Sequence, residues 1–598
     1  MTAKNSAEII KALRKREGLT INKAPEKTNT EENNVIEIEQ ELPERAIKKV
    51  SPYAPVSSQA VTPLGFEITE QGIYFVPANE EKPKILICHE PIFITGRYEN
   101  MTDGTEGLTV SWFQDNRWKT IKRSKDNFMI QSKLVELSAL GFPVNTINQR
   151  LMVQYLTAYE RENTSTIPLQ KASEQMGWLE DGFLLGNKFI GEQEVTFVSS
   201  DKGEEQFSKS YHEKGSIQEW ISLIARIKDF PKVIAGVYAS FASPLVHIFN
   251  TKTFIFEWSG ETSKGKTISQ RVAASVWGNP DESGILKKWN NTPVAIERLA
   301  SLTNHVPLFL DDTKQAYAKN VASTVYNLAG GQGKGRGSIK GMQITRQWKN
   351  IVFSTGEQVI TAFSKDGGTA ARVIPITGLP FGKADDETFL IVKQLERGIK
   401  RHYGTAGKIF IEFLLDNKDQ WETWQEMFEQ KDIFYAERAK GNTIASRLAE
   451  YFALIDMASV LFKKCFNLQW DNKPLLSLWD EIILENEDID RPKQALEAVM
   501  SWIHSEENRL FVRDGETKFK PSDCIGKWNE DKDEDLCLYT IKLENFLQTQ
   551  GYEPGAIIKS WIEREWLKCD KGRTKKKVSV KGTKEWMYVI KIECIESL

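Results

Sequence analysis

Residues 260–267 read Gly-Glu-Thr-Ser-Lys-Gly-Lys-Thr, a complete G-x-x-x-x-G-K-[ST] phosphate-binding loop. A strand-like run from Thr253 to Trp258 precedes the loop, and a segment of helix-forming composition follows it from Thr267 to Trp277. Phosphate would therefore meet the N-terminus of a helix, where the helix dipole favours negative charge. This context predicts an α/β fold that binds a nucleotide.

The fixed positions of the loop each have a physical role. Gly260 and Gly265 allow the backbone to curl so that its N–H groups face the β-phosphate of ATP. Lys266 supplies a charge for the β- and γ-phosphates, and Thr267 offers a hydroxyl ligand to Mg²⁺. The residues predicted to bind ATP are Gly260, Glu261, Thr262, Ser263, Lys264, Gly265, Lys266 and Thr267.

An acid pair follows the next apolar strand pattern, Val306 to Leu310. A buried strand that ends in an acid is what a Walker B motif requires, because it delivers a carboxylate beside the phosphate loop. We therefore predict Asp311 as a Mg²⁺ ligand together with Thr267. Many ATPases have glutamate in the next position as the base for the attacking water. Asp312 is one methylene shorter, so either it fills that role with altered reach or another residue does.

Residues 313–356 contain no Asp or Glu and many cations. At their centre lies a glycine-dense loop, residues 330–341, that carries Lys334, Arg336 and Lys340. One interpretation is a solvated, flexible turn. The other is a hairpin that presents these cations to a nucleic-acid backbone, since cations without aromatic residues suit phosphate contact rather than base reading.

Two more features follow along the chain. The strand pattern 350–353 ends in Ser354 and Thr355, whose hydroxyl groups could position the attacking water or could simply cap the strand. Arg372 stands where a glycine-rich loop enters an apolar strand. It could reach the γ-phosphate in a neighbouring subunit as an arginine finger, although a lone arginine more often forms a salt bridge.

Composition limits the class of protein. The chain has 598 residues, 40% hydrophobic and 27% charged, with a net charge of −3, so any nucleic-acid binding must be local. Its six cysteines form no C-x-x-C pair, which favours reduced thiols over disulfides or a zinc site. The apolar stretch Val233 to Phe249 contains Ser240, Pro244 and His247, which indicates a buried helix rather than a membrane span. We expect a cytoplasmic protein with no membrane partner.

The patterns along the chain predict a multidomain α/β protein. Residues 1–63 are polar and proline-rich and are predicted to be a disordered tail or linker. Residues 64–214 read as a β-rich N-terminal domain, 215–400 as an α/β nucleotide-binding core and 401–484 as a helical region. Residues 485–598 end in two helix patterns, a basic turn and two short strands, the outline of a winged helix-turn-helix.

The order of these motifs resembles a family of AAA+ ATPases of mobile elements. Within it the chain is most similar to the MCM-like replicative helicases (Cch) of staphylococcal cassette chromosomes, with a detailed match over about residues 230–470. The residues that carry the resemblance are Trp289-Asn-Asn-Thr292, Glu297, Asn304, the Leu308–Asp312 strand, Gly331-Gln-Gly-Lys-x-Arg336, Phe353-Ser-Thr-Gly-Glu357 and Arg372.

The resemblance implies an AAA+ P-loop ATPase core over 215–400 and a helical lid over 401–484. It implies a ring, expected to be a hexamer, that hydrolyses ATP between subunits and unwinds DNA for replication of a mobile genetic element. The expected partners are single- and double-stranded DNA, further copies of the chain and other replication proteins of the same element. The implied roles are Walker A for Lys266 and Thr267, Walker B for Asp311 and Asp312, sensor 1 for Ser354 or Thr355, trans arginine finger for Arg372, sensor 2 for Arg447, and pre-sensor hairpin for Lys334, Arg336 and Lys340.

Two alternatives stay open on the sequence. An AAA+ initiator or loader would bind and remodel origin DNA through the winged helix without processive unwinding. A protein-directed AAA+ remodeller would thread polypeptide, but such machines commonly use an aromatic pore loop, whereas the loop at 330–341 is cationic and has no aromatic residue.

Overall fold

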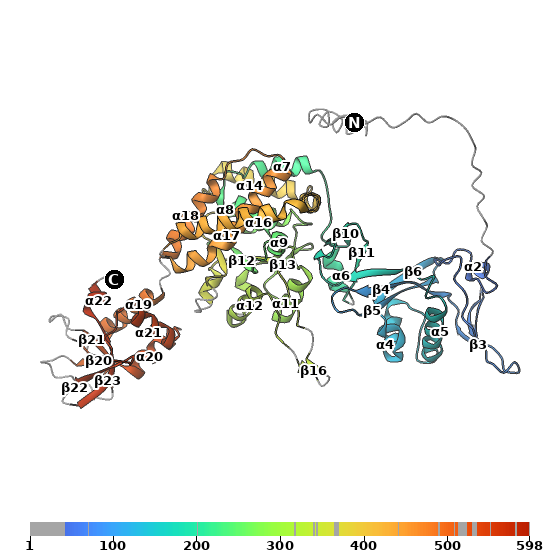
Figure 1. The fold of residues 1–598 in the computed structure, drawn as a ribbon, viewed down its shortest axis with the longest axis horizontal. Helices are drawn as coiled ribbons and strands as arrows, with labels where there is room; N and C mark the ends of the chain where they lie inside the picture. Colours follow the sequence, from blue (N-terminus) through green and yellow to red (C-terminus); the bar gives the residue numbers. More distant parts are fainter. Residues whose placement is uncertain are drawn as a thin grey trace.

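The computed structural model describes residues 42–596, except 70, 200, 316–317, 336, 339–340, 343–344, 364–369, 441, 488–490, 507–508, 512–522, 529–534, 551 and 581–582. The chain forms an elongated molecule of three parts (Figure 1). A part rich in strands and a smaller C-terminal part lie at opposite ends, and a larger α/β part lies between them. The predicted multidomain α/β architecture is confirmed.

The central part is built on a five-stranded parallel sheet. Its strands lie in the order β13 (Leu286–Lys288), β14 (Leu308–Asp311), β17 (Ile351–Gly356), β12 (Phe254–Ser259) and β18 (Val373–Ile376). These strands are apolar on both faces, as a parallel sheet covered by helices requires. Because the strands are parallel, β12, β14 and β17 all end at one edge, where a ligand of an open α/β sheet binds.

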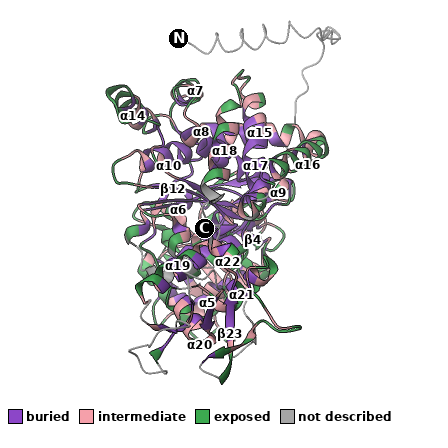
Figure 2. Ribbon diagram, turned by 90° about the vertical axis from the view of Figure 1, so that its left-hand side faces the viewer, coloured by how far each residue is buried: buried purple, intermediate pink, exposed green. Residues whose placement is uncertain are grey.

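Helices cover both faces of this sheet. On one face lie α8 (Pro231–Ala242) and α10 (Lys266–Ala274), whose apolar side chains share a core with Phe256 and Phe353. On the other lie α11 (Pro293–Leu302) and α12 (Ala318–Gly330), which share a core with Ile255. Figure 2 shows α8 as buried.

The apolar stretch 233–249 is therefore a buried segment, as predicted. It contains most of α8 and all of α9 (Leu245–Ile248), and their apolar side chains belong to the central core. Within the described part of the chain, no helix combines the length and the apolar character that crossing a bilayer would take.

Further helices pack around α8. The long helix α17 (Thr443–Cys465) contacts α8, α16 (Trp421–Arg438) and α18 (Lys473–Glu487). Its residues Leu448 and Phe452 are fully buried in the same hydrophobic core as the sheet. The other helices of this layer are α7 (Ile217–Ala225), α14 (Asp386–Ile399) and α15 (Thr405–Asp416).

The N-terminal part contains a mixed five-stranded sheet. Its order is β11 (Val195–Phe197), β7 (Leu169–Ser173), β4 (Ile92–Asn100), β5 (Glu106–Gln114) and β6 (Arg117–Ser124). The pairs β4–β5 and β5–β6 are antiparallel, and β7 runs parallel to both of its neighbours. An antiparallel sheet of β1 (Phe66–Thr69), β2 (Gly72–Phe75) and β3 (Ile85–Cys88), with helices α3 (Asp126–Met129), α4 (Gln131–Glu136) and α5 (Gln149–Glu162), completes this part.

Residues 42–63 depart from the prediction of a disordered tail. They include helix α2 (Ile47–Val50), and Ile47 is only 1% exposed in the N-terminal core. The side chain of Asn163 fixes the segment, since it accepts a hydrogen bond from the Val61 N–H at 2.7 Å and donates one to the Val61 carbonyl at 2.9 Å. Few but well-placed apolar residues therefore outweigh the proline-rich composition. Residues 1–41 lie outside the described part.

Residues 174–214 also pack differently from the predicted boundary. They form β8 (Gly177–Leu179), β9 (Gly182–Leu185), β10 (Lys188–Gly191), β11 and α6 (Lys202–Ser208). The indole of Trp178 donates to the Pro244 carbonyl at 2.9 Å, and its backbone N–H donates to His305 Nδ1 at 3.0 Å. Apolar residues of this segment join the central core, so the segment connects the two parts rather than belonging to one.

The C-terminal part has its own hydrophobic core. Helix α19 (Arg491–Ser505) precedes α20 (Thr540–Thr549) and α21 (Pro554–Glu563), and the strands are β19 (Leu510–Phe511), β20 (Gly526–Lys527), β21 (Leu536–Tyr539), β22 (Lys576–Val580) and β23 (Thr583–Ile590), followed by α22 (Ile592–Glu596). Two consecutive helices followed by an antiparallel β22–β23 hairpin reproduce the predicted outline. The turn before the hairpin is basic, and its Arg573 guanidinium lies 4.5 Å from the centre of the Trp586 ring on β23.

Candidate functional site

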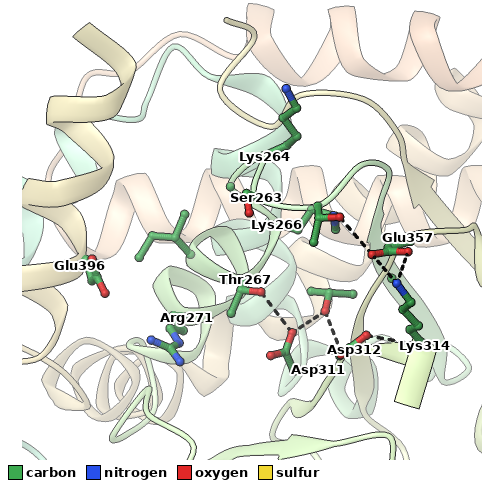
Figure 3. Close-up of a pocket in the computed structure, with 15 residues that line it drawn as sticks. Ser263, Lys264, Lys266, Thr267, Arg271, Asp311, Asp312, Lys314, Glu357 and Glu396 are labelled. Atoms are coloured by element: carbon green, nitrogen blue, oxygen red, sulfur yellow. Dashed lines mark hydrogen bonds and ion pairs between the residues drawn. The ribbon is translucent and has the colours of Figure 1, made fainter. Parts of the chain in front are cut away.

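The phosphate loop opens into a cavity of about 750 Å³ at the carboxyl edge of the central sheet (Figure 3). The cavity is lined by residues 262–268, Arg271, Asp311, Asp312, Lys314, Thr355, Gly356, Glu357 and Glu396. The loop after β12, the ends of β14 and β17, and the helices α10 and α14 thus contribute to one site.

The backbone of the loop has the curled shape that the sequence predicts. Gly260 and Gly265 have positive φ angles of 138° and 94°, and Gly265 is the N-cap of α10. A Cβ on Gly265 would lie 2.9 Å from the ring of Phe381, so no other residue fits there without displacement. The N-terminus of α10 therefore faces the cavity. The first N–H groups of a helix have no partner within the helix, which makes this end a suitable site for a phosphate.

Lys266 folds back into the loop. Its ammonium donates to the Gly260 carbonyl at 2.8 Å and to the Glu261 carbonyl, and the residue is only 9% exposed. Burial lowers the pKa of Lys266, while the nearby carboxylates, Glu357 first, oppose that shift. Within the described part of the chain, the hydrogen bonds of the ammonium go to carbonyl oxygens, so an anionic phosphate in the loop would be a stronger partner.

The acid pair lies beside Thr267. The Thr267 hydroxyl is 3.4 Å from Asp311 Oδ1, and the Thr355 hydroxyl donates to the same oxygen at 2.5 Å. Asp312 has a positive φ of 61°, and its carboxylate accepts from the Lys314 N–H at 3.2 Å. Its own N–H donates to the Thr355 hydroxyl at 3.0 Å. Thr355 therefore connects both acids to the end of β17.

These donors fit a magnesium ion shared with a nucleotide. A hydroxyl and a carboxylate oxygen are hard ligands, and Mg²⁺ commonly uses one or two such protein ligands together with substrate phosphates. Within the described residues there is no group of three or more His, Cys, Asp or Glu side chains that could hold a metal by itself. Thr267 and Asp311, the predicted pair, are the side chains that could hold such an ion.

The sequence left open whether Ser354 or Thr355 faces the site, and the structure distinguishes the two. Thr355 lines the cavity, whereas Ser354 is fully buried on the other side of β17. The Ser354 hydroxyl accepts from the Trp289 indole at 3.1 Å and lies 3.5 Å from Glu257 Oε1. Neighbouring residues of a strand point to opposite faces, so of these two residues only Thr355 reaches the cavity.

Arg372 and Arg447 lie away from the cavity. The Arg372 carbonyl accepts from the Ile255 N–H at 2.9 Å, which places Arg372 where β12 and β18 begin. The phosphate loop follows the other end of β12, about 16 Å further along the strand. The Arg372 guanidinium lies over the Tyr326 ring at 5.1 Å, and its Nη1 has no hydrogen-bond partner among the described residues. Arg447 is exposed near the start of α17.

The cationic loop contains a hairpin. Strands β15 (Gly337–Ser338) and β16 (Gly341–Met342) pair in antiparallel fashion, and Lys334 is exposed at the base of this hairpin. Arg336 and Lys340 lie outside the described residues.

Sequence reasoning assigned no role to Glu357 and Lys314, which both line the cavity. The Thr262 hydroxyl donates to Glu357 Oε1 at 3.1 Å, and the Lys314 ammonium is 3.0 Å from Glu357 Oε2 (Figure 3). These hydrogen bonds, from Lys314 first, lower the pKa of Glu357. The only signal in the sequence was a carboxylate directly after the last residue of β17.

A second cavity of about 370 Å³ shares Ser263, Lys264 and Gly265 with the first. Its apolar wall consists of Leu379, Phe381, Phe389 and Val392. An apolar hollow beside a phosphate loop suits the flat ring of a nucleobase.

Glu257 is a buried acid in the middle of β12. It accepts hydrogen bonds from the Ile360 N–H at 2.7 Å and from Ser354, yet burial dominates and raises its pKa to about 8. The folded protein therefore holds this proton where the unfolded chain has released it.

We expect the contribution of Glu257 to the free energy of unfolding to fall as the pH rises from 5 to 8. The contribution of Glu257 is complete below the unfolded pKa and is lost as the pH rises through the folded value of about 8. Between these two pKa values the free energy of unfolding falls by up to about 1.4 kcal/mol per pH unit. In Glu257→Gln protein the midpoint of thermal unfolding should depend less on pH than in the unmodified chain. Glu219→Gln, at an exposed position on α7, is the control and should leave this pH dependence unchanged. Parallel profiles for Glu257→Gln and the unmodified chain would contradict this assignment.

Two parts of the chain match known protein families. Residues 66–349 match a family described as a domain of unknown function (DUF927). Residues 490–594 match the Cch helix-turn-helix domain, which confirms the predicted helix-turn-helix. No curated protein matches the chain.

The fold is similar to that of a solved helicase. The structure titled "SCCmec type IV Cch - active helicase" superposes with a TM-score of 0.67 at 17% identity, over 89% of this chain and 98% of that one. The predicted resemblance to Cch is thus confirmed at the level of the fold. The alignment with an apo structure of the NrS-1 C-terminal region covers 83% of this chain and 95% of that one at 10% identity, with a TM-score of only 0.28.

Proposed function

We propose that this chain, which has the fold of the Cch helicase, is an ATP-dependent DNA helicase that acts as a hexameric ring in the replication of a mobile genetic element. One observation carries the proposal. Lys266, Thr267, Asp311 and Thr355 meet at one edge of the central sheet, while Arg372 lies at the opposite edge. A site split in this way is completed only by a second subunit.

In this proposal residues 215–400 form an AAA+ core with a lid over 401–484, a β-rich domain precedes them, and the C-terminal part is a winged helix. ATP is the substrate of the larger cavity, with its phosphates at the N-terminus of α10 and its base against Phe381 and Leu379. Mg²⁺ held by Thr267 and Asp311 would supply positive charge to the phosphates.

In this proposal one of two carboxylates orients the attacking water. Asp312 and Glu357 both line the cavity, and Thr355 bonds to the backbone of Asp312. Asp312 is the shorter side chain, and its carboxylate is already turned toward the Lys314 N–H. We therefore propose that either Asp312 or Glu357 orients the attacking water. Asp312 belongs to the Walker B motif, whereas Glu357 lies outside both Walker motifs.

Arg372 acts on the ATP of the neighbouring subunit. It is too far from the phosphate loop of its own chain, and one of its donors has no partner among the described residues. A guanidinium near the γ-phosphate would stabilise the charge that develops as the bond breaks. Arg447, exposed on α17, would contribute from the lid.

The proposal is tested by strand displacement on a forked DNA substrate with ATP. A helicase releases the displaced strand in proportion to ATP hydrolysed, and Lys266→Ala should release none. Binding and local melting of duplex DNA without strand release would instead support an initiator or loader.

The hairpin β15–β16 is expected to couple hydrolysis to movement along DNA. Replacing Lys334 and Arg336 together with alanine should leave basal ATPase within about twofold while strand displacement falls at least tenfold, because the cations contact phosphates and not the nucleotide. The exposed pair Arg401 and Lys418, replaced in the same way, serves as control. Normal unwinding by the hairpin variant would remove the channel role from this loop.

A further inference from the structure

A third cavity lies in the N-terminal part, for which the proposed function assigns no ligand. It has a volume of about 430 Å³ and is lined mainly by β6, by the end of β11 with residues 198–199, and by α6 with Lys209 directly after it. These elements lie where the N-terminal part meets the central part (Figure 1). The lining residues are Trp112, Lys119, Thr120, Ile121, Lys122, Arg123, Leu140, Asn187, Phe197, Val198, Ser199, Lys202, Glu205 and Lys209.

The cavity has a strong excess of positive charge. Five of its lining residues are cations, and Glu205 is the one acid among them. Arg123 pairs with Glu205 at 3.0 Å, and Lys119 pairs with Asp115 at 2.8 Å. Two of the cations are thus neutralised by the protein itself.

The other three cations lack such partners. Among the described residues, Lys122, Lys202 and Lys209 make neither a hydrogen bond nor an ion pair through their side chains. Lys122 is only partly exposed, and burial lowers its pKa, with Glu194 opposing the shift. An ammonium that is partly desolvated without a partner costs free energy, which an anionic ligand would offset.

The two edges of the sheet close on the cavity. β6 and β11 are the outer strands of the five-stranded sheet, yet the Arg123 guanidinium donates to the Ser199 carbonyl at 3.3 Å. The floor includes the apolar side chains of Trp112, Leu140 and Phe197. Arg123 therefore links the two edges of the sheet at the cavity, while Lys202 and Lys209 are exposed to solvent beside it.

We propose that this cavity binds the phosphate groups of a single DNA strand. The cations continue beyond the cavity along the edge strand to the exposed Arg117, which suits a polymer of phosphates better than a single free anion. The proposal rests on the proposed function only for DNA as the polymer. Its contacts would hold the strand before it reaches the central part.

The test uses the full chain without ATP, so that it does not depend on hydrolysis. Binding of a fluorescein-labelled single-stranded oligonucleotide is followed by anisotropy at several salt concentrations. The variant Lys122→Gln, Lys202→Gln, Lys209→Gln should bind about tenfold more weakly, and its salt slope should fall by about 2, since three phosphate contacts are lost. Basal ATPase and thermal midpoint should not change.

Matched controls keep the outcome interpretable. Lys49, Lys82 and Arg150 are exposed cations of the same part outside the cavity, and their triple glutamine variant should bind as the unmodified chain does. If the cavity variant does not fold, the single reversal Lys202→Glu on the exposed start of α6 replaces it. Unchanged affinity and salt slope in the cavity variants would overturn the proposal.

A second arm distinguishes DNA from a free phosphate ligand. Pyrophosphate is titrated by calorimetry into Lys266→Ala protein, which removes the phosphate-loop lysine, with and without the cavity substitutions. Saturable pyrophosphate binding that the cavity substitutions abolish, with DNA affinity unchanged, would assign the cavity to a free anion and contradict the proposal. Loss of strand displacement alone would bear on the proposed function and not on this cavity.

Discussion

Replacing Lys266 with alanine is expected to abolish ATP hydrolysis, with a fall in kcat of at least about a hundredfold. In the structure the Lys266 ammonium is buried in the loop and held by two backbone carbonyl groups at the place where phosphates would bind. Without it the loop would retain its N–H groups but lose the charge that faces the β- and γ-phosphates. Hydrolysis is measured by phosphate release with and without DNA.

Lys252 provides the matched control for Lys266. It is exposed just before β12, the strand that leads to the phosphate loop, and Lys252→Ala should hydrolyse ATP as the unmodified chain does. Normal hydrolysis by Lys266→Ala would mean that the cavity at residues 260–267 is not the ATP site.

Replacing Arg372 with alanine is expected to reduce kcat about a thousandfold while ATP still binds. Its place at the start of β18 keeps it far from the phosphate loop of the same chain, so the loss reflects a missing contact between subunits. Arg372→Lys should not restore the rate, because a lysine lacks the planar fork of donors. Binding of a fluorescent ATP analogue and phosphate release are measured in parallel.

Arg401→Ala, at an exposed arginine outside both cavities beside the phosphate loop, is the control for Arg372. A loss of nucleotide binding equal to the loss of turnover would contradict the arginine-finger role. That result would indicate that Arg372 supports the fold of the sheet edge, where its guanidinium lies over Tyr326.

The phosphate loop, the acid pair and the strand-end hydroxyl could be predicted because each depends on residues close in sequence. A strand, a turn and a helix place Gly260 to Thr267 without help from distant residues. The parallel strands then bring Asp311 and Thr355 to the same edge. Motifs that depend on residues close in sequence can therefore be predicted from a single sequence.

Other features depend on packing between distant segments. The choice between Ser354 and Thr355 required the register of β17, since one residue faces Trp289 and the other faces Asp311. Glu357 belongs to the site only through its contacts with Thr262 and Lys314, which no spacing rule predicts.

The predicted domain boundaries were least accurate where a few apolar residues determine which core a segment packs against. Residues 42–63 have the composition of a tail, but Asn163 fixes Val61 and the N-terminal core buries Ile47. Trp178 belongs to the predicted N-terminal domain, yet it packs in the central core and bonds to Pro244. Such contacts follow from tertiary structure and leave little trace in local pattern.

Mixing two inactive variants tests the intersubunit site most directly. Equal amounts of Lys266→Ala and Arg372→Ala protein are mixed and allowed to exchange subunits, so that rings containing both variants form. The mixture is then assayed for ATP hydrolysis. In a ring with head-to-tail interfaces, about one quarter of the sites would pair an intact phosphate loop with an intact arginine from the next subunit. We predict recovery of about a quarter of the unmodified ATPase rate from this mixture. Mixed rings that stay as inactive as either variant alone would contradict the account.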